Sequence, residues 1–173
     1  MAAKLRVRSV MAKTEIPNRP DAFAGRRQVA IVASLYNEDY VQGLLDHCLD
    51  ELTQLVPHSA RSIYRVPGAF EIPVAVAEVL ATRKPDVLIA LGVIIQGATA
   101  HAELVAESVT ASLQQQSVTQ RIPIIHEVLL VQSAGQAEER TLQPRLNRGR
   151  EAARAAVNML ELFTRLRSDE TSG

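Results

Sequence analysis

The chain lacks several features that mark particular classes of protein. It has one cysteine, Cys48, which excludes an internal disulfide framework. Acidic and basic residues both number 19, so the net charge is zero and no general nucleic-acid-binding surface is expected. No apolar run is long enough to span a membrane, and no secretory hydrophobic segment opens the chain. The four histidines (His47, His58, His101 and His126) do not have the spacing of metal ligands.

With 173 residues, the chain is expected to form one main domain. Residues 1–20 contain Pro17 and Pro20 and little periodicity, so they are predicted to be a disordered or arm-like extension. Residues 168–173 are polar and are predicted to be a disordered tail, which leaves a domain over residues 21–167. The expected compartment is the cytoplasm.

Strand and helix patterns alternate along the domain. Short apolar runs predict strands over residues 28–34, 62–66, 87–91 and 122–131. Apolar residues at helical spacing predict helices over 37–55, 72–82, 100–115 and 148–166. Repeated strand–helix units joined by short loops indicate a parallel sheet covered on both faces. The predicted fold is α/β, a flavodoxin-like three-layer α/β/α sandwich with a four-stranded parallel sheet.

The turn at residues 97–99 is the most informative segment of the chain. It joins a buried strand to a helix through Gly97, Ala98 and Thr99. Free backbone N–H groups and the helix dipole at such a turn attract anions, phosphate above all. His101 follows in the first helical turn, and a histidine titrates near neutral pH. The segment therefore indicates a phosphorylated small molecule with acid–base chemistry beside its phosphate, although such turns and histidines also occur without a function.

Unusual residues also follow the first two strands. Tyr36 and Asn37 come after the first strand, and Phe70 and Glu71 come after the second. Taken singly, the aromatic residues would be core residues, Asn37 a helix cap and Glu71 an acid at a helix start. Because ligands bind beyond the carboxyl ends of parallel strands, the cluster instead favours a slot for a flat heterocycle. In that slot the aromatic rings would stack, and Glu71 would accept N–H groups.

Several segments resemble one enzyme family at matching spacing. The loop at 68–73 has the sequence Gly-Ala-Phe-Glu-Ile-Pro, and the turn at 97–101 has Gly-Ala-Thr-Ala-His. An aromatic–Asn pair at 36–37, the segment Gln-Ala-Glu-Glu-Arg at 136–140 and Asn-Arg-Gly at 147–149 match the same pattern. With these segments the chain resembles the lumazine synthases, from about residue 26 to residue 163.

The resemblance implies roles for particular residues. His101 would be the catalytic proton shuttle. Phosphate binding is implied for Gly97, Ala98, Thr99 and Arg140. Binding of the pyrimidine and its ribityl chain is implied for Tyr36, Asn37, Ala69, Phe70, Glu71, Val93, Ile94, Ile95, His126 and Arg148. For Glu71 the implied partners are ribityl hydroxyls, in place of the ring N–H groups that the residues alone suggest.

The resemblance also implies a reaction and an assembly. In this family, 5-amino-6-ribitylamino-pyrimidinedione condenses with 3,4-dihydroxy-2-butanone 4-phosphate through a Schiff base, phosphate loss and ring closure. The product is 6,7-dimethyl-8-ribityllumazine, and neither metal nor organic cofactor is required. A pentamer with active sites at subunit contacts is expected, and an arm before residue 28 would add a strand to a neighbour's sheet. Decamers, icosahedral shells and association with riboflavin synthase are further expectations from the resemblance.

Four positions depart from the family pattern. His126 stands where most relatives have Phe, Glu127 replaces the following Gly, Arg148 replaces Lys, and Gln96 replaces a basic residue. A histidine ring can still stack on a pyrimidine, although its charge depends on pH. No matched catalytic position is lost, so the synthase is the leading hypothesis. The alternative is a non-catalytic flavin- or lumazine-binding or shell protein on the same fold.

Overall fold

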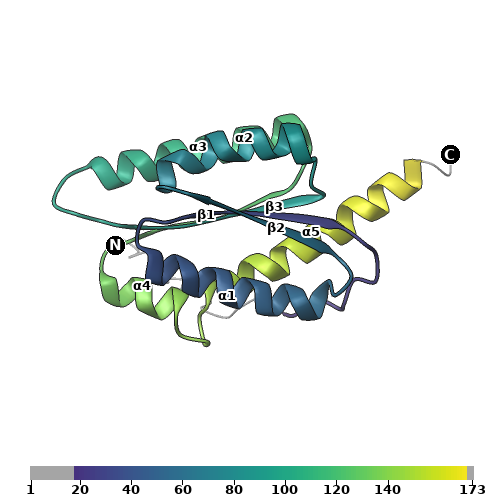
Figure 1. The fold of residues 1–173 in the computed structure, drawn as a ribbon, viewed down its shortest axis with the longest axis horizontal. Helices are drawn as coiled ribbons and strands as arrows, with labels where there is room; N and C mark the ends of the chain where they lie inside the picture. Colours follow the sequence, from purple (N-terminus) through teal and green to yellow (C-terminus); the bar gives the residue numbers. More distant parts are fainter. Residues whose placement is uncertain (1–17, 171–173) are drawn as a thin grey trace, which may run out of the picture.

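The computed structural model describes residues 18–170, which fold into three layers around a parallel sheet (Figure 1). The sheet has four strands in the order β2-β1-β3-β4, and every neighbouring pair is parallel. This confirms the predicted fold class. The strands are β1 (Gln28–Ser34), β2 (Ala60–Val66), β3 (Val87–Ile95) and β4 (Ile124–Val131).

Helices cover both faces of this sheet. In Figure 1, α2 and α3 lie above the strands, while α1, α4 and α5 lie below them. The helices are α1 (Glu38–Leu55), the 3₁₀ turn η1 (Ala69–Glu71), α2 (Ile72–Arg83), α3 (His101–Gln120), α4 (Ala134–Thr141) and α5 (Arg148–Glu170). None of the described helices is both long enough and apolar enough to cross a membrane.

Strand β1 supplies side chains to two separate cores, because successive residues of a strand point to opposite faces. Ile31 and Ala33 belong to the core under α1 and α5. Ala30 and Val32 belong to the core under α2 and α3. The central position of β1 and β3 explains their nearly continuous apolar sequences, since both faces of each strand are buried.

The observed boundaries differ from the predicted ones at several element ends. Strand β2 begins at Ala60, two residues before its apolar part, because an edge strand needs less apolar sequence than a central one. Helix α3 continues to Gln120. Helix α5 continues to Glu170, so residues 168–170 of the expected tail are helical, and residues 171–173 lie outside the described residues.

Helix α4 (Ala134–Thr141) was not predicted. Its first turn is capped by Ser133, whose hydroxyl accepts a hydrogen bond from the backbone N–H of Gln136 at 3.3 Å. The helix has eight residues and buries only Ala137 and Thr141. So short an element carries too few apolar residues to produce a visible helical period.

The predicted arm falls largely on residues 1–17, which lie outside the described residues. The part that follows packs against α1 and α5 of its own chain. Arg19 donates a hydrogen bond to Glu51 at 2.9 Å, and the Phe23 backbone N–H donates one to the Leu55 carbonyl at 2.7 Å. The addition of a strand to a neighbour's sheet stays a prediction.

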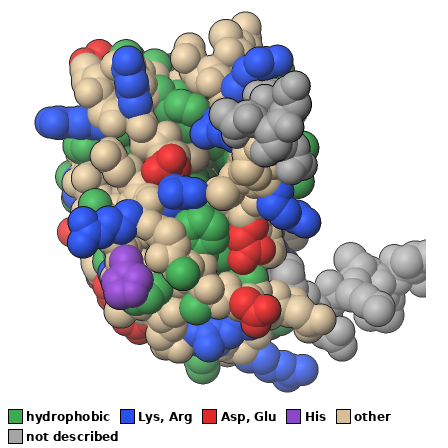
Figure 2. Space-filling view, turned by 90° about the vertical axis from the view of Figure 1, so that its right-hand side faces the viewer, with side chains coloured by type: hydrophobic (Ala, Val, Ile, Leu, Met, Phe, Trp, Pro, Cys, Tyr) green, Lys and Arg blue, Asp and Glu red, His purple; other side chains and the backbone are tan. Residues whose placement is uncertain are grey.

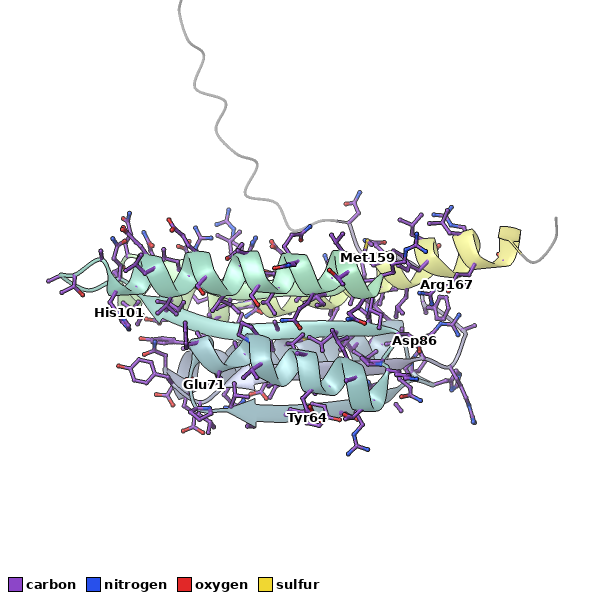
Figure 3. All side chains as sticks on the ribbon, turned by 90° about the horizontal axis from the view of Figure 1, so that it is seen from above. Tyr64, Glu71, Asp86, His101, Met159 and Arg167 are labelled. Atoms are coloured by element: carbon purple, nitrogen blue, oxygen red, sulfur yellow. The ribbon has the colours of Figure 1, made fainter. Side chains whose placement is uncertain are left out.

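The two ends of the sheet differ in character. In Figure 3, His101 and Glu71 lie at the end formed by the carboxyl termini of the strands, and Asp86 and Arg167 lie at the opposite end. Figure 2 views that opposite end and shows Lys and Arg side chains scattered among acidic ones. The predicted site residues of the first three loops therefore belong to one end of the molecule.

Candidate active site

A cavity of about 310 Å³ lies at the carboxyl ends of β1 and β3, between η1 and the start of α3. Three loops that are distant in sequence meet there, because parallel strands end at the same edge of a sheet. Its lining contains ten of the fifteen predicted site residues. The lining residues are Tyr36, Asn37, Gly68, Ala69, Phe70, Val93, Ile94, Ile95, Gly97, Thr99, His101, Ala102 and Val105.

Two aromatic side chains stand at the rim of this cavity. Tyr36 is 73% exposed and Phe70 is 62% exposed. Neither is therefore a core residue of the subunit, which was the alternative for each taken singly. Exposed aromatic faces beside a cavity are suited to stacking on a flat ring or to contact with another subunit.

Asn37 joins the first and third strand ends. Its backbone is left-handed, with φ 58° and ψ 45°, a conformation that Asn adopts more readily than most residues. Its side-chain amide donates a hydrogen bond to the Val93 carbonyl at 2.8 Å. The expectation that this side chain caps α1 is wrong, because the amide is engaged by β3 and makes no cap hydrogen bond. Asn37 instead links two strand ends that line the cavity.

The anion turn leads directly into α3. Gly97 faces open space, since a Cβ atom there would meet no heavy atom within 4 Å. Ala100 precedes the helix and provides no side-chain cap, so the first N–H groups of α3 remain for a ligand or water. Gln96 donates a hydrogen bond to Glu103 at 2.7 Å, which ties the end of β3 to the first turn of α3.

His101 is the first residue of α3, and it is exposed on the cavity wall. It lines the same cavity as Gly97 and Thr99, and its role as an acid–base group next to an anion stays a prediction. Among residues 18–170, no three His, Cys, Asp or Glu side chains lie close enough together to hold a metal ion.

Glu71 does not line this cavity but lies beside it. It lines a neighbouring groove of about 520 Å³ between α2 and α3, and Phe70 lines both hollows. A Cβ atom at Gly68 would lie only 3.0 Å from a Glu71 carboxylate oxygen. The carboxylate therefore reaches back over the cavity loop, and glycine at position 68 allows this approach. Ala98, within the turn, is also not part of the cavity lining.

Three further predicted site residues, His126, Arg140 and Arg148, do not line the cavity of their own subunit. His126 is the third residue of β4, where its ring nitrogen Nε2 is 3.0 Å from the Thr110 hydroxyl on α3. That hydroxyl donates its own hydrogen to the Ala106 carbonyl, so the histidine Nε2 carries the hydrogen of this contact. Burial lowers the pKa of His126 below its usual value.

Arg140 and Arg148 lie with two carboxylates on the other face of β4, in what we call the charged cluster: Glu127, Arg140, Arg148 and Glu151. The Arg148 Nε donates a hydrogen bond to Glu127 at 2.9 Å, and its Nη1 donates one to Glu151. Burial raises the pKa of Glu127 to about 7, although Arg148 and Arg140 oppose the shift. The sequence marked Glu127 only as a departure from the family; a charged residue inside an apolar strand was the available signal.

The comparisons agree with the geometry. A family model described as 6,7-dimethyl-8-ribityllumazine synthase matches residues 26–164. The chain belongs to the lumazine synthase family. A 6,7-dimethyl-8-ribityllumazine synthase of Halorhodospira halophila is 37% identical over 138 residues, covering 79% of this chain and 88% of the relative. One from a Polaromonas species is 36% identical over 148 residues, covering 84% and 94%. The resemblance seen in the sequence is confirmed.

Proposed function

We propose that this lumazine synthase family member catalyses the condensation of 5-amino-6-ribitylamino-pyrimidinedione with 3,4-dihydroxy-2-butanone 4-phosphate to 6,7-dimethyl-8-ribityllumazine. The cavity at the strand ends carries this proposal, because it joins an aromatic rim, an anion turn and His101. The named synthases among its relatives favour the enzyme over a non-catalytic binding or shell protein.

In the proposed complex, each part of the cavity has a separate task. Tyr36 and Phe70 contact the pyrimidine, and Glu71 accepts hydrogen bonds from the ribityl hydroxyls. The backbone of Gly97 and Thr99, with the α3 dipole, holds the phosphate of the butanone. His101 carries protons during Schiff-base formation, phosphate loss and ring closure. Holding two substrates side by side accounts for most of the acceleration, and proton transfer for less.

We propose that the site is completed by a neighbouring subunit. His126, Arg140 and Arg148 lie outside the cavity of their own chain, which supports the proposal that they face the cavity of a neighbour. Exposed apolar side chains on α2 and α3, namely Val74, Leu104 and Val118, support subunit contact as well. The family resemblance suggests a ring of five. Higher assemblies, a riboflavin synthase partner and a cytoplasmic location stay predictions.

The first experiment is to mix the purified protein with both substrates and follow the absorbance and fluorescence of the lumazine. The wild-type protein is expected to form the product, and its absence would overturn the proposal. His101→Ala should slow turnover by roughly ten- to a thousandfold, because substrate positioning remains. His58→Ala is the matched control, since His58 is exposed at the opposite end of the sheet. An unchanged rate in the His101 variant would remove that residue from the mechanism.

A further inference from the structure

Glu127 is a carboxylate in a position that otherwise suits an apolar side chain. It pairs in register with Leu91 of β3, which is fully buried, and its own side chain is 8% exposed. Burial raises the pKa of Cys48 on α1, and the negative charge of Glu127 adds to this shift. A charge buried among apolar groups costs free energy unless it is paired. The residue that pairs with Glu127 therefore indicates what Glu127 does.

That partner is Arg148, the first residue of α5. Its Nε donates to Glu127 at 2.9 Å and its Nη1 donates to Glu151, so two carboxylates on different elements hold one planar group. Two hydrogen bonds from a planar fork fix both its position and its rotation. A lysine could not be fixed in this way, because its ammonium is a point charge on a flexible stem.

The Arg148 guanidinium has further N–H donors that these two hydrogen bonds do not use. Within residues 18–170, no hydrogen bond involves its Nη2 atom, and the Arg148 side chain is 37% exposed. Glu127 and Glu151 are both hydrogen-bonded to Arg148, so their negative charges offset the positive charge of its guanidinium. Arg148 therefore presents N–H groups with little net charge behind them, which suits a neutral acceptor such as a carbonyl or hydroxyl oxygen better than a phosphate.

We propose that Glu127 is a positioning residue, which orients the Arg148 guanidinium so that its free N–H groups meet the neutral pyrimidine substrate in the cavity of a neighbouring subunit. This inference rests on the proposed function. Glu151 holds the same guanidinium from α5. In this arrangement Glu127 and Arg148 act as one unit, so that the carboxylate matters for binding only while the arginine is present.

A double-mutant cycle tests this dependence. Steady-state kinetics at pH 8, with each substrate varied in turn, are compared for wild type, E127Q, R148A and E127Q/R148A. The glutamine keeps the shape of Glu127 but loses the charge-assisted hydrogen bond. E127Q should raise the KM for the pyrimidine about three- to tenfold and leave the KM for the butanone phosphate within about twofold. In the R148A background, the same change should alter the pyrimidine KM by less than about twofold.

Two outcomes would overturn the proposal. One is an equal effect of E127Q in both backgrounds; the other is an unchanged pyrimidine KM with a lower unfolding midpoint, which would make Glu127 an anchor of α5 only. Should E127Q not fold, E151Q removes the second carboxylate from the more accessible side of Arg148. It should raise the same KM, and failure to do so would likewise contradict the inference.

Glu51→Gln is the matched control. Glu51 is also a buried carboxylate, and it accepts hydrogen bonds from Arg19 and Arg154 at 2.9 Å away from the charged cluster. Its amide variant should lower the unfolding midpoint without changing either KM. Calorimetric titration of the pyrimidine alone measures its affinity without turnover. An absence of turnover in wild type would therefore refute the reaction, whereas an unchanged affinity in E127Q would refute the positioning role.

Discussion

Arg140 is exposed on α4, while the anion turn lies at the start of α3. A planar guanidinium facing a neighbour's phosphate would recognise only the substrate that carries the anion. Arg140→Ala should therefore weaken binding of the butanone phosphate about ten- to a hundredfold and change pyrimidine binding little. Calorimetry with each ligand separately measures this difference. Equal losses for both ligands would refute the phosphate role of Arg140.

Glu127 should make the stability of the protein depend on pH. Its pKa is raised from 4.5 to about 7 in the folded protein, chiefly by burial. The folded state therefore binds more protons than the unfolded state between these values, so the free energy of unfolding falls as pH rises from about 5 to 8. E127Q lacks this titration, and its stability relative to wild type should rise over that interval, by on the order of 3 kcal/mol.

Chemical denaturation of both proteins at pH 5, 6.5 and 8 measures this difference. The titration of His126 is common to both proteins and cancels. A difference between wild type and E127Q that stays constant from pH 5 to 8 would mean that Glu127 does not titrate as described.

At the residue scale, the placement of several candidate site residues was predictable from the sequence, whereas individual contacts were not. The anion turn with His101, and the aromatic residues after β1 and β2, were predictable because parallel strands end together. The role of Asn37 was not, since its bond to the Val93 carbonyl depends on how far apart two strand ends lie. The pairing of Glu127 with Arg148 joins residues 21 positions apart and also required coordinates.

Among the elements, the start of α5 has an unusually close contact with α1. A Cβ atom on Gly149 would lie 2.0 Å from the Leu44 carbonyl oxygen. Asn147, the residue before α5, is fully buried and accepts a hydrogen bond from the Gly149 backbone N–H at 2.9 Å. The segment 147–149, noticed in the sequence as a family element, is thus also a structural joint that places Arg148.

Gly149→Ala should destabilise the fold by about 3 kcal/mol, because two helix backbones must separate to admit one methyl group. Gly135→Ala in α4 is the control, since the nearest atom to its added methyl lies 3.9 Å away. That change should be neutral or slightly stabilising, as alanine is the better helix former. Denaturant midpoints for the two variants provide the comparison, and a similar stability for both would contradict the close contact.

The elements themselves were predictable in proportion to their apolar content. The central strands and the long helices α1 and α5 bury many residues, and their periods were evident in the sequence. Helix α4 buries two residues and was missed, and edge strand β2 was predicted two residues too short. Tertiary contact, rather than local propensity, determines such elements.

For the whole molecule, the proposed site divides between two subunits, and this division can be tested by mixing. His101→Ala damages the cavity, and Arg140→Ala damages the charged cluster. If neighbours share sites, a mixed ring made from equal amounts of the two variants pairs an intact cavity with an intact cluster at about a quarter of its contacts. Co-expression should therefore restore about a quarter of wild-type activity.

Light scattering measures the mass of the mixed and wild-type assemblies. The shared site requires a mass near five subunits or a multiple of five. A monomer or dimer would defeat the shared site. So would a mixture no more active than the average of its two components.

The separation of the cavity from the charged cluster has a genetic consequence. If neighbouring subunits share the site as proposed, a subunit damaged in both parts would spoil two contacts, one with each neighbour, although it is a single chain. In a cell with equal amounts of normal and doubly damaged chains, about a quarter of the sites would remain intact, against one half for an enzyme with self-contained sites. Damage to this chain would then be partly dominant, because a normal subunit beside a damaged one also loses the site that the two share.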